Sequence, residues 1–148
     1  MDNELITVEL AQLADYRFEN RFGADVPALH SDEPAPLGTG QGPSPVQLLC
    51  AAVGNCLSAS LLFALRKFKQ QPEPLHTTVQ AEVGRNAEGR LRILQMHATL
   101  HLGVAAGQLQ HLDRVLGQFE SFCTVTQSVG QGIPITVKVV DAEGSVLK

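Results

Sequence analysis

The order of hydrophobic and polar positions divides the chain into segments of different periodicity. Residues 5–34 mix β-branched, aromatic and charged side chains in near alternation, which predicts two or more antiparallel strands. Residues 75–104 alternate in the same way around the turn GRNAEG and predict a β-hairpin or two meander strands. Residues 105–123 return to helical spacing, and residues 132–144 are typical of a closing strand. This order predicts an α+β fold with a mainly antiparallel sheet.

The most apolar segment follows a Pro- and Gly-rich loop at residues 33–45, which we expect to be ordered. Ser44 suits the N-cap of a helix, and Pro45 suits its first position. From Val46 to about Lys69 the predicted helix is apolar on nearly every side. A helix of this kind must be buried inside the domain or against a partner, so we predict a homodimer that does not dissociate without unfolding.

Length and composition limit the possible classes of protein. The chain has 148 residues, of which 44% are hydrophobic and 18% charged, and this predicts one domain over residues 1–148 with a real core. A net charge of -4 gives no electrostatic reason to expect nucleic acid. We expect no membrane span, because no 18 apolar residues follow one another without interruption. The N-terminus lacks a signal-peptide layout, so we expect a cytoplasmic protein.

The three cysteines of the chain are the candidate chemistry. In a reducing compartment, each is either a small core residue or a reactive thiol. Cys50 and Cys56 lie about 240° apart around the helix, so they do not share a face, and we interpret Cys50 as core packing. No CxxC and no His/Cys cluster with zinc spacing occurs in the sequence, and we expect neither metal nor cofactor. His97 and His101 share a strand face and are interpreted as sheet or surface histidines.

Two stretches give the chain a resemblance to a known family. They are GTGQGPSPVQLLCAAVGNCLSASLLFALRKF, residues 38–68, and FESFCTVTQSV, residues 119–129. Their spacing and the order of elements resemble the OsmC/Ohr family of thiol-dependent hydroperoxide reductases, in its OsmC-like branch. The resemblance extends to the early YRFENRFG strand and the last ITVKVV strand. It implies a swapped homodimer, in which antiparallel sheets wrap around two long central helices and each site lies near the subunit interface.

The resemblance also implies a reaction. Cys56 would attack an organic hydroperoxide as a thiolate and become a sulfenic acid, and Cys123 would resolve it into a disulfide that a dithiol reductant reopens. A second thiol makes sense chemically, because a sulfenic acid left alone is vulnerable to over-oxidation. The alternative function is a non-enzymatic dimer that binds an apolar small molecule in the same pocket.

A nucleophilic thiol needs a nearby cation or hydrogen-bond donors, because its reference pKa is about 8.5. The family supplies an arginine from the N-terminal strand region, where this chain has Arg17 and Arg21 on the same strand face, and both remain candidates, with a slight preference for Arg17. Val46 stands where the family has the glutamate that holds this arginine, so Glu19 is the alternative holder. The family's Cys-Pro-Val-Ser is altered to Cys-Thr-Val-Thr at residues 123–126.

Overall fold

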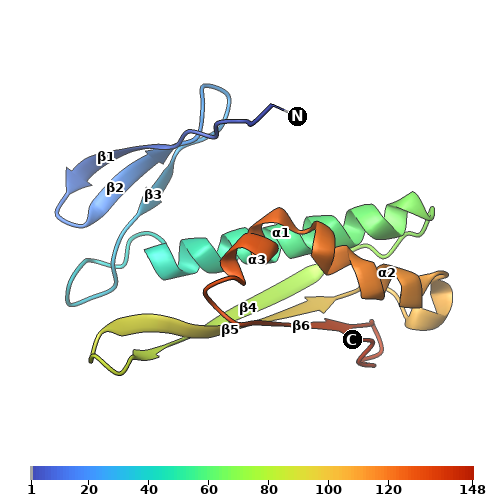
Figure 1. Ribbon diagram of the computed structural model, residues 1–148. Helices are drawn as coiled ribbons and strands as arrows, with labels where there is room; N and C mark the ends of the chain where they lie inside the picture. The colour runs from blue at the N-terminus through green and yellow to red at the C-terminus, as the bar shows by residue number, and fades with distance from the viewer. Residues whose placement is uncertain (1) are drawn as a thin grey trace. The chain divides into compact units, whose positions relative to one another are not determined.

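The computed structural model describes residues 2–148, which form two compact units divided after Leu48. The N-terminal unit contains strands β1 (Glu9–Ala14), β2 (Arg17–Arg21) and β3 (Leu29–Ser31) (Figure 1). They form an antiparallel sheet in the order β1-β2-β3. The antiparallel strands predicted for residues 5–34 are therefore confirmed.

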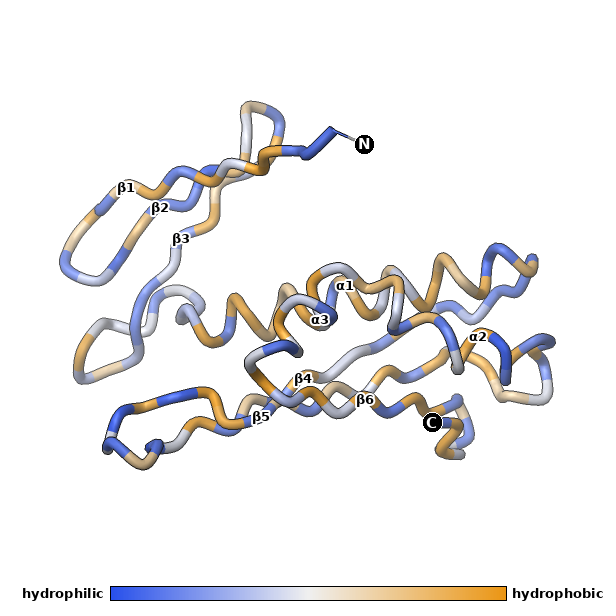
Figure 2. The backbone as a smooth tube through the Cα atoms, viewed as in Figure 1, coloured by the Kyte–Doolittle hydropathy of each residue, from blue (hydrophilic) through white to orange (hydrophobic). Residues whose placement is uncertain are grey.

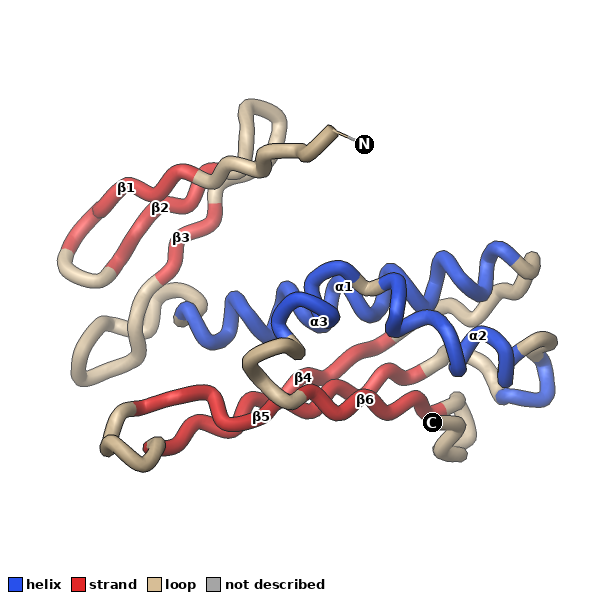
Figure 3. Tube along the Cα trace, in the orientation of Figure 1, coloured by secondary structure: helices blue, strands red, loops and turns tan. Residues whose placement is uncertain are grey.

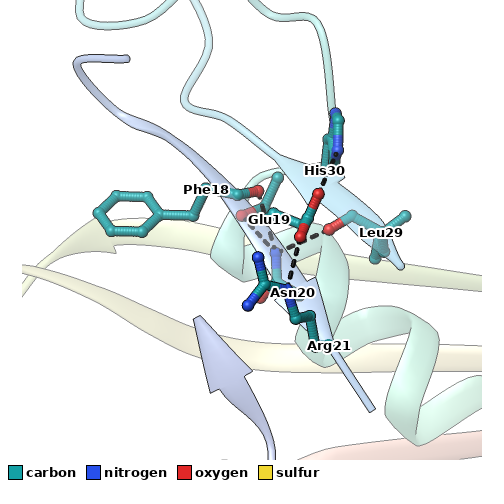
Figure 4. Close-up of polar contacts among 7 residues, drawn as sticks. Phe18, Glu19, Asn20, Arg21, Leu29 and His30 are labelled. Carbon is teal, nitrogen blue, oxygen red and sulfur yellow. Dashed lines mark hydrogen bonds and ion pairs between the residues drawn. The ribbon is translucent and has the colours of Figure 1, made fainter. Parts of the chain in front are cut away.

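A buried amide holds β2 and β3 together. The side chain of Asn20 is 5% exposed and donates hydrogen bonds to the carbonyl of Leu29 at 3.1 Å and to Ser31 Oγ at 2.9 Å. Figure 4 shows this amide between the strands, with the charged side chains of Glu19 and Arg21 beside it. Because a buried amide without partners costs free energy, these bonds fix the register of the short strand β3.

The loop after β3 is organised by Asp32, which is 2% exposed. Its carboxylate accepts hydrogen bonds from Thr39 Oγ1 at 2.5 Å and from the backbone N–H groups of Thr39 and Gln41. The Thr39 hydroxyl is the main cause that lowers the pKa of Asp32, against the opposing effect of burial. The loop is thus ordered, as the sequence predicts.

Gly40 and Gly42 allow this loop to adopt its conformation. Gly40 has a φ of +67°, a left-handed conformation that glycine adopts without a steric cost. A Cβ atom on Gly42 would lie 2.2 Å from the carbonyl oxygen of His30, so only glycine fits this approach. The loop can therefore turn back along β3 into the following helix.

The long apolar segment forms one helix, α1 (Pro45–Lys67). Its first turn is closed by a reciprocal cap, in which Gln47 N–H donates to Ser44 Oγ at 3.2 Å and Ser44 N–H donates to Gln47 Oε1 at 2.9 Å. The predicted N-cap at Ser44 is confirmed. The helix ends at Lys67, close to the predicted end near Lys69, because Lys69 adopts a φ of +59° and the N–H of Gln70 donates to the carbonyl of Leu65.

The C-terminal unit contains a second sheet, in the order β4 (His76–Arg85), β5 (Leu91–His101) and β6 (Ile135–Val140) (Figure 3). Strands β4 and β5 form the predicted antiparallel hairpin. Strand β6 pairs with β5 in parallel, which differs from a purely antiparallel sheet. The reason is the connection: the chain crosses over the sheet through helices between β5 and β6, and a crossover of this kind returns a strand in the same direction.

The helical segment predicted from residue 105 is broken into four short pieces. They are η1 (Ala106–Gln108), α2 (Leu112–Gln118), η2 (Phe119–Phe122) and α3 (Thr124–Val129). The breaks fall at His111, which has a φ of +60°, and at Cys123, whose backbone is extended. Cys123 therefore lies just past η2 and is also the N-cap of α3, within a segment that the sequence predicts as one helix.

The core of the C-terminal unit lies between α1 and the sheet. Figures 1 and 2 show α1, α2 and α3 on the same face of β4-β5-β6. Every fourth residue of α1 turns its apolar side chain into this layer with 0% exposure: Val53, Leu57, Leu61 and Leu65. A Cβ atom on Gly54 would lie 2.9 Å from Val79 Cγ2, so this glycine lets α1 pack closely on β4.

The other side of α1 carries apolar residues that the chain itself leaves uncovered, such as Phe63 at 73% exposure. By length and composition alone, α1 is also long and apolar enough to cross a membrane, a test that core helices pass as well. Its buried stripe on the sheet is that of a core helix. The expectations of no membrane span, one domain and a homodimer stay predictions.

Candidate active site

The structure brings the two predicted redox cysteines together. Cys56 lies at the middle of α1, and Cys123 is buried between η2 and α3 with 0% exposure. Both are free thiols, and each affects the pKa of the other. Residues that are far apart in sequence thus meet at one point on the helical face of the C-terminal unit.

Several donors surround the sulfur of Cys56. Burial by itself would raise the pKa of Cys56, but the thiol of Cys123 donates a hydrogen bond to its sulfur, and so do the backbone N–H groups of Val125 and Thr126. The Ser60 hydroxyl, one turn further along α1, adds another. Together these donors stabilise the thiolate and hold the pKa of Cys56 below its ordinary value. Cys56 has the environment of a nucleophile.

Cys123 has the opposite environment. Burial raises the pKa of Cys123, and the neighbouring sulfur of Cys56 raises it further. Its Sγ lies 3.0 Å from Thr126 Oγ1, within the same first turn of α3. Of the two thiols, Cys56 is therefore the one that ionises more readily. This asymmetry agrees with the roles that the family resemblance implies.

Cys50 stands apart from this pair. It is half-buried and packs against the core, as interpreted from the sequence, and burial raises its pKa. Its surroundings include Asn55 and Ser58, on the side of α1 that faces Leu75 and Thr77. Cys50 is thus a natural internal control for the reactivity of Cys56.

We expect Cys56 to alkylate at lower pH than Cys50 in the reduced protein. Only the thiolate reacts with iodoacetamide, so the alkylation rate of a cysteine rises as the pH passes its pKa. The lowered pKa of Cys56 places this rise at lower pH, and the raised pKa of Cys50 places it at higher pH. Mass spectrometry of peptides alkylated from pH 5 to 10 gives both profiles from one sample. Ser60→Ala should shift the Cys56 profile upward and leave that of Cys50 in place. Coincident profiles for the two cysteines would contradict the assignment.

A pocket of about 480 Å³ opens beside Cys56. Its walls are mostly apolar and come from α1 and the segment before α3. The aromatic residues that line it are Phe63, Phe68, Phe119 and Phe122. Two basic side chains, Lys67 and Arg114, also line it, and no lining residue is acidic. The volume suits a small organic ligand. An apolar peroxide can therefore reach the sulfur of Cys56 from this side.

The two candidate arginines belong to the N-terminal unit and differ in their partners. Arg21 is paired with Glu19 at 2.6 Å, and Glu19 also contacts His30 at 3.4 Å (Figure 4). Arg17 Nη1 donates to the neutral Gln41 Oε1 at 2.6 Å, and among the described residues its buried Nε has no hydrogen-bond partner. Glu19 therefore does hold an arginine, but that arginine is Arg21. The assignment of either to Cys56 stays a prediction.

The groups nearest to the cysteine pair were not predicted from the sequence. Ser60 follows Cys56 by four residues, and this helical spacing already places both on one face. The backbone donors of Val125 and Thr126 were not predicted, because they depend on the break of the helix at Cys123. Lys67 and Arg114 were also missed: Lys67 belongs to the basic end of α1, and Arg114 reaches the pocket from α2.

The histidines form a separate group on the second sheet. His101 stands opposite His76 in the β4–β5 register, and the centroids of the two rings are 5.6 Å apart. His97 lies four residues before His101 on β5, so the two side chains share a face of the sheet. Within residues 2–148, no group of three or more His, Cys, Asp or Glu side chains could hold a metal ion.

Comparison with known proteins places the chain in a family. Residues 38–138 match the family described as OsmC-like protein, and the chain belongs to it. Among curated proteins, none matches the chain at a significant level.

Solved structures share the fold at low identity. An OsmC-like protein of unknown function from Vibrio cholerae is 13% identical with a TM-score of 0.78, covering 93% of this chain and 100% of that one. An organic hydroperoxide resistance protein from Elizabethkingia anophelis is 13% identical with a TM-score of 0.73, covering 95% and 99%. The organic hydroperoxide resistance protein OhrB of Bacillus subtilis is 13% identical with a TM-score of 0.69, covering 92% and 99%. These likenesses establish an OsmC/Ohr-type α+β fold for the chain.

Proposed function

We propose that the protein is a thiol-dependent peroxidase that reduces organic hydroperoxides, with Cys56 as the attacking and Cys123 as the resolving cysteine. The observation that carries the proposal is the pair of neighbouring free thiols beside an apolar pocket, in which the pKa of Cys56 is lowered and that of Cys123 raised. The OsmC-like family and the hydroperoxide resistance proteins of the same fold agree with this chemistry.

The first half of the reaction consumes the peroxide. The Cys56 thiolate attacks the terminal oxygen of ROOH, the O–O bond breaks, and Cys56 becomes a sulfenic acid. The leaving alkoxide must take up a proton, and the thiol of Cys123, beside the reacting sulfur, can donate it. This donation leaves Cys123 as a thiolate. Two electrons pass from the sulfur to the peroxide, and the alcohol ROH is released.

The second half restores the thiols. The Cys123 thiolate attacks the sulfur of Cys56, the S–O bond breaks, and hydroxide leaves as water once protonated. The resulting disulfide keeps Cys56 from further oxidation. A dithiol reductant then supplies two electrons and two protons by thiol–disulfide exchange, and both cysteines return to the reduced form.

Titration of free thiols tests this cycle. Treating the reduced protein with one equivalent of cumene hydroperoxide should remove two of its three free thiols per chain, and dithiothreitol should restore them. The two lost thiols should be Cys56 and Cys123, identified by mass spectrometry of the disulfide-linked peptides. If all three thiols stay free while the peroxide persists, the alternative holds: a non-enzymatic protein that binds a small molecule in the pocket beside Cys56.

We also propose a cytoplasmic homodimer as the working form. The support is the apolar side of α1 that the chain leaves uncovered, including Phe63 near the C-terminal end of the helix, together with Phe122 at 76% exposure. A second copy would cover such a surface. If sedimentation equilibrium shows a folded monomer at micromolar concentration, the proposed dimer is wrong.

A further inference from the structure

Lys148 contacts the helical segment that leads to Cys123. Its Nζ donates a hydrogen bond to the carbonyl oxygen of Leu116 at 2.8 Å and forms an ion pair with Glu120. The same Nζ lies 5.3 Å from the ring centroid of Phe119, which is 1% exposed, and this is within the range of a cation–π contact. One ammonium group therefore contacts α2 at Leu116 and η2 at two of its four residues.

The backbone around Lys148 is fixed to strand β6. The N–H of Val139 donates to the carbonyl oxygen of Lys148 at 3.1 Å, and the N–H of Leu147 donates to the carbonyl oxygen of Val139 at 2.8 Å. The next residue of β6, Val140, forms an antiparallel bridge with Val146. Lys148 is thus a link between the second sheet and the α2–η2 segment, with its backbone on β6 and its ammonium group on the helices.

The held segment positions the proposed resolving cysteine. The carbonyl oxygen of Glu120 accepts hydrogen bonds from the N–H of Cys123 at 3.0 Å and from Gln127 Nε2 at 3.0 Å. Cys123 has an extended backbone between two short helices, so a continuous helical ladder does not fix it. Lys148 therefore holds the side chain of Glu120, and the backbone of Glu120 holds Cys123.

The attacking cysteine is carried by the same sheet. Cys56 lies on α1, whose fully buried residues Leu57 and Leu61 belong to the core between this helix and the sheet. Both sulfur atoms are therefore placed from one base: Cys56 through the packing of α1, and Cys123 through the link at Lys148. The side chains of Lys148 and Glu120 are 33% and 27% exposed, so their ion pair contributes little to global stability, and its effect is on local position.

We propose that Lys148 is a positioning residue for the resolving step, because it keeps the sulfur of Cys123 beside that of Cys56. As far as it concerns peroxide, the inference rests on the proposed peroxidase function. The sulfenic acid on Cys56 has two fates. Cys123 attacks its sulfur, the oxygen leaves as water and the disulfide forms, or a second hydroperoxide oxidises it to a sulfinic acid and leaves as the alcohol. Loosening η2 slows only the first fate, since that step depends on the effective concentration of one thiol at the other.

The position of Cys123 can be measured without any peroxide. In glutathione buffers, oxidised glutathione takes two electrons from the thiol pair, and the Cys56–Cys123 disulfide forms by thiol–disulfide exchange. We expect Lys148→Gln to lower the equilibrium constant for this disulfide about fivefold or more. Lys148→Arg should restore it, because a guanidinium can still donate to the carbonyl of Leu116 and pair with Glu120. Mass spectrometry of acid-quenched samples gives the oxidised fraction.

Two further variants control this measurement. Glu120→Gln removes the ion pair but leaves the hydrogen bond to Leu116, so it should lower the constant by a smaller factor than Lys148→Gln. Lys138→Gln is the matched control and should leave the constant unchanged. It removes an exposed lysine of β6 that belongs to none of the ion pairs of residues 2–148.

The outcomes separate this inference from the proposed function. An unchanged constant in Lys148→Gln, an equal loss in Lys138→Gln, no rescue by Lys148→Arg, or no disulfide at all in oxidised glutathione would each overturn it, whether or not the protein consumes peroxide. A lowered constant in a protein that consumes no peroxide supports the inference and refutes the peroxidase. Where peroxide is consumed, Lys148→Gln should form the sulfinic acid of Cys56 at about fivefold lower cumene hydroperoxide, with an unchanged rate of the first turnover.

Discussion

Replacing Cys56 with Ser is expected to abolish peroxide consumption, whereas replacing Cys123 with Ser should leave a single turnover. The Cys56 sulfur accepts several hydrogen bonds that stabilise its thiolate, and the pocket opens beside it. Cys123 is buried, and burial raises the pKa of its thiol. A serine at position 56 cannot supply a thiolate, so no step of the cycle can begin. A serine at position 123 removes only the group that traps the sulfenic acid.

Mass spectrometry after one equivalent of cumene hydroperoxide distinguishes the variants. In Cys123→Ser, dimedone should label Cys56, and excess peroxide should convert Cys56 to the sulfinic form. Cys50→Ser is the control, because Cys50 packs against the core away from the pair, and it should consume peroxide at the rate of the unmodified protein. Dimedone labelling of Cys123 in the Cys56→Ser protein would reverse the two roles. Absence of labelling in every variant would favour the binding-protein alternative.

Much of the fold could be predicted because its signals are local. The alternation on either side of the β4–β5 turn predicts a hairpin, and Ser44 before Pro45 predicts where α1 begins, and both are confirmed. The parallel pairing of β6 could not be predicted from its own residues, because direction is set by the crossover that precedes it. The division of the second helical segment likewise depends on backbone conformation at His111 and Cys123.

The candidate site could be predicted only in part, for a related reason. The resemblance identifies Cys56 and Cys123, and the structure brings them together. The donors that act on Cys56 include two backbone N–H groups. Because nearly every residue has such a group, the sequence cannot indicate which of them contact Cys56. The same holds for the charge of the pocket, since Lys67 and Arg114 come from different helices and meet only in the fold. Patterns within one element are visible in sequence, whereas contacts between elements are not.

The second large effect is expected at Arg17. Its guanidinium donates to the neutral amide of Gln41, and its buried Nε has no partner among the described residues, so it retains charge and donors for a thiolate. Arg21 already neutralises Glu19, whose pKa is lowered chiefly by the hydrogen bond from Arg21. Arg17, which has no acidic partner among the described residues, is therefore the better candidate than Arg21 for the arginine that acts on Cys56. Arg17→Lys keeps the charge but loses the planar fork.

We therefore expect Arg17→Lys to raise the pH at which Cys56 alkylates and to lower kcat/KM for cumene hydroperoxide about tenfold or more, since a nearby guanidinium shifts a pKa by about one to three units. Arg21→Lys is the matched control, because a lysine can still pair with Glu19 on the exposed face of the sheet. The alkylation profile of Cys50 should stay in place in both variants, because no arginine is assigned to it. A larger loss in Arg21→Lys would transfer the role to Arg21. Unchanged Cys56 profiles in both variants would show that the hydrogen bonds of Cys123, Ser60 and the start of α3 suffice to ionise the thiol without an arginine.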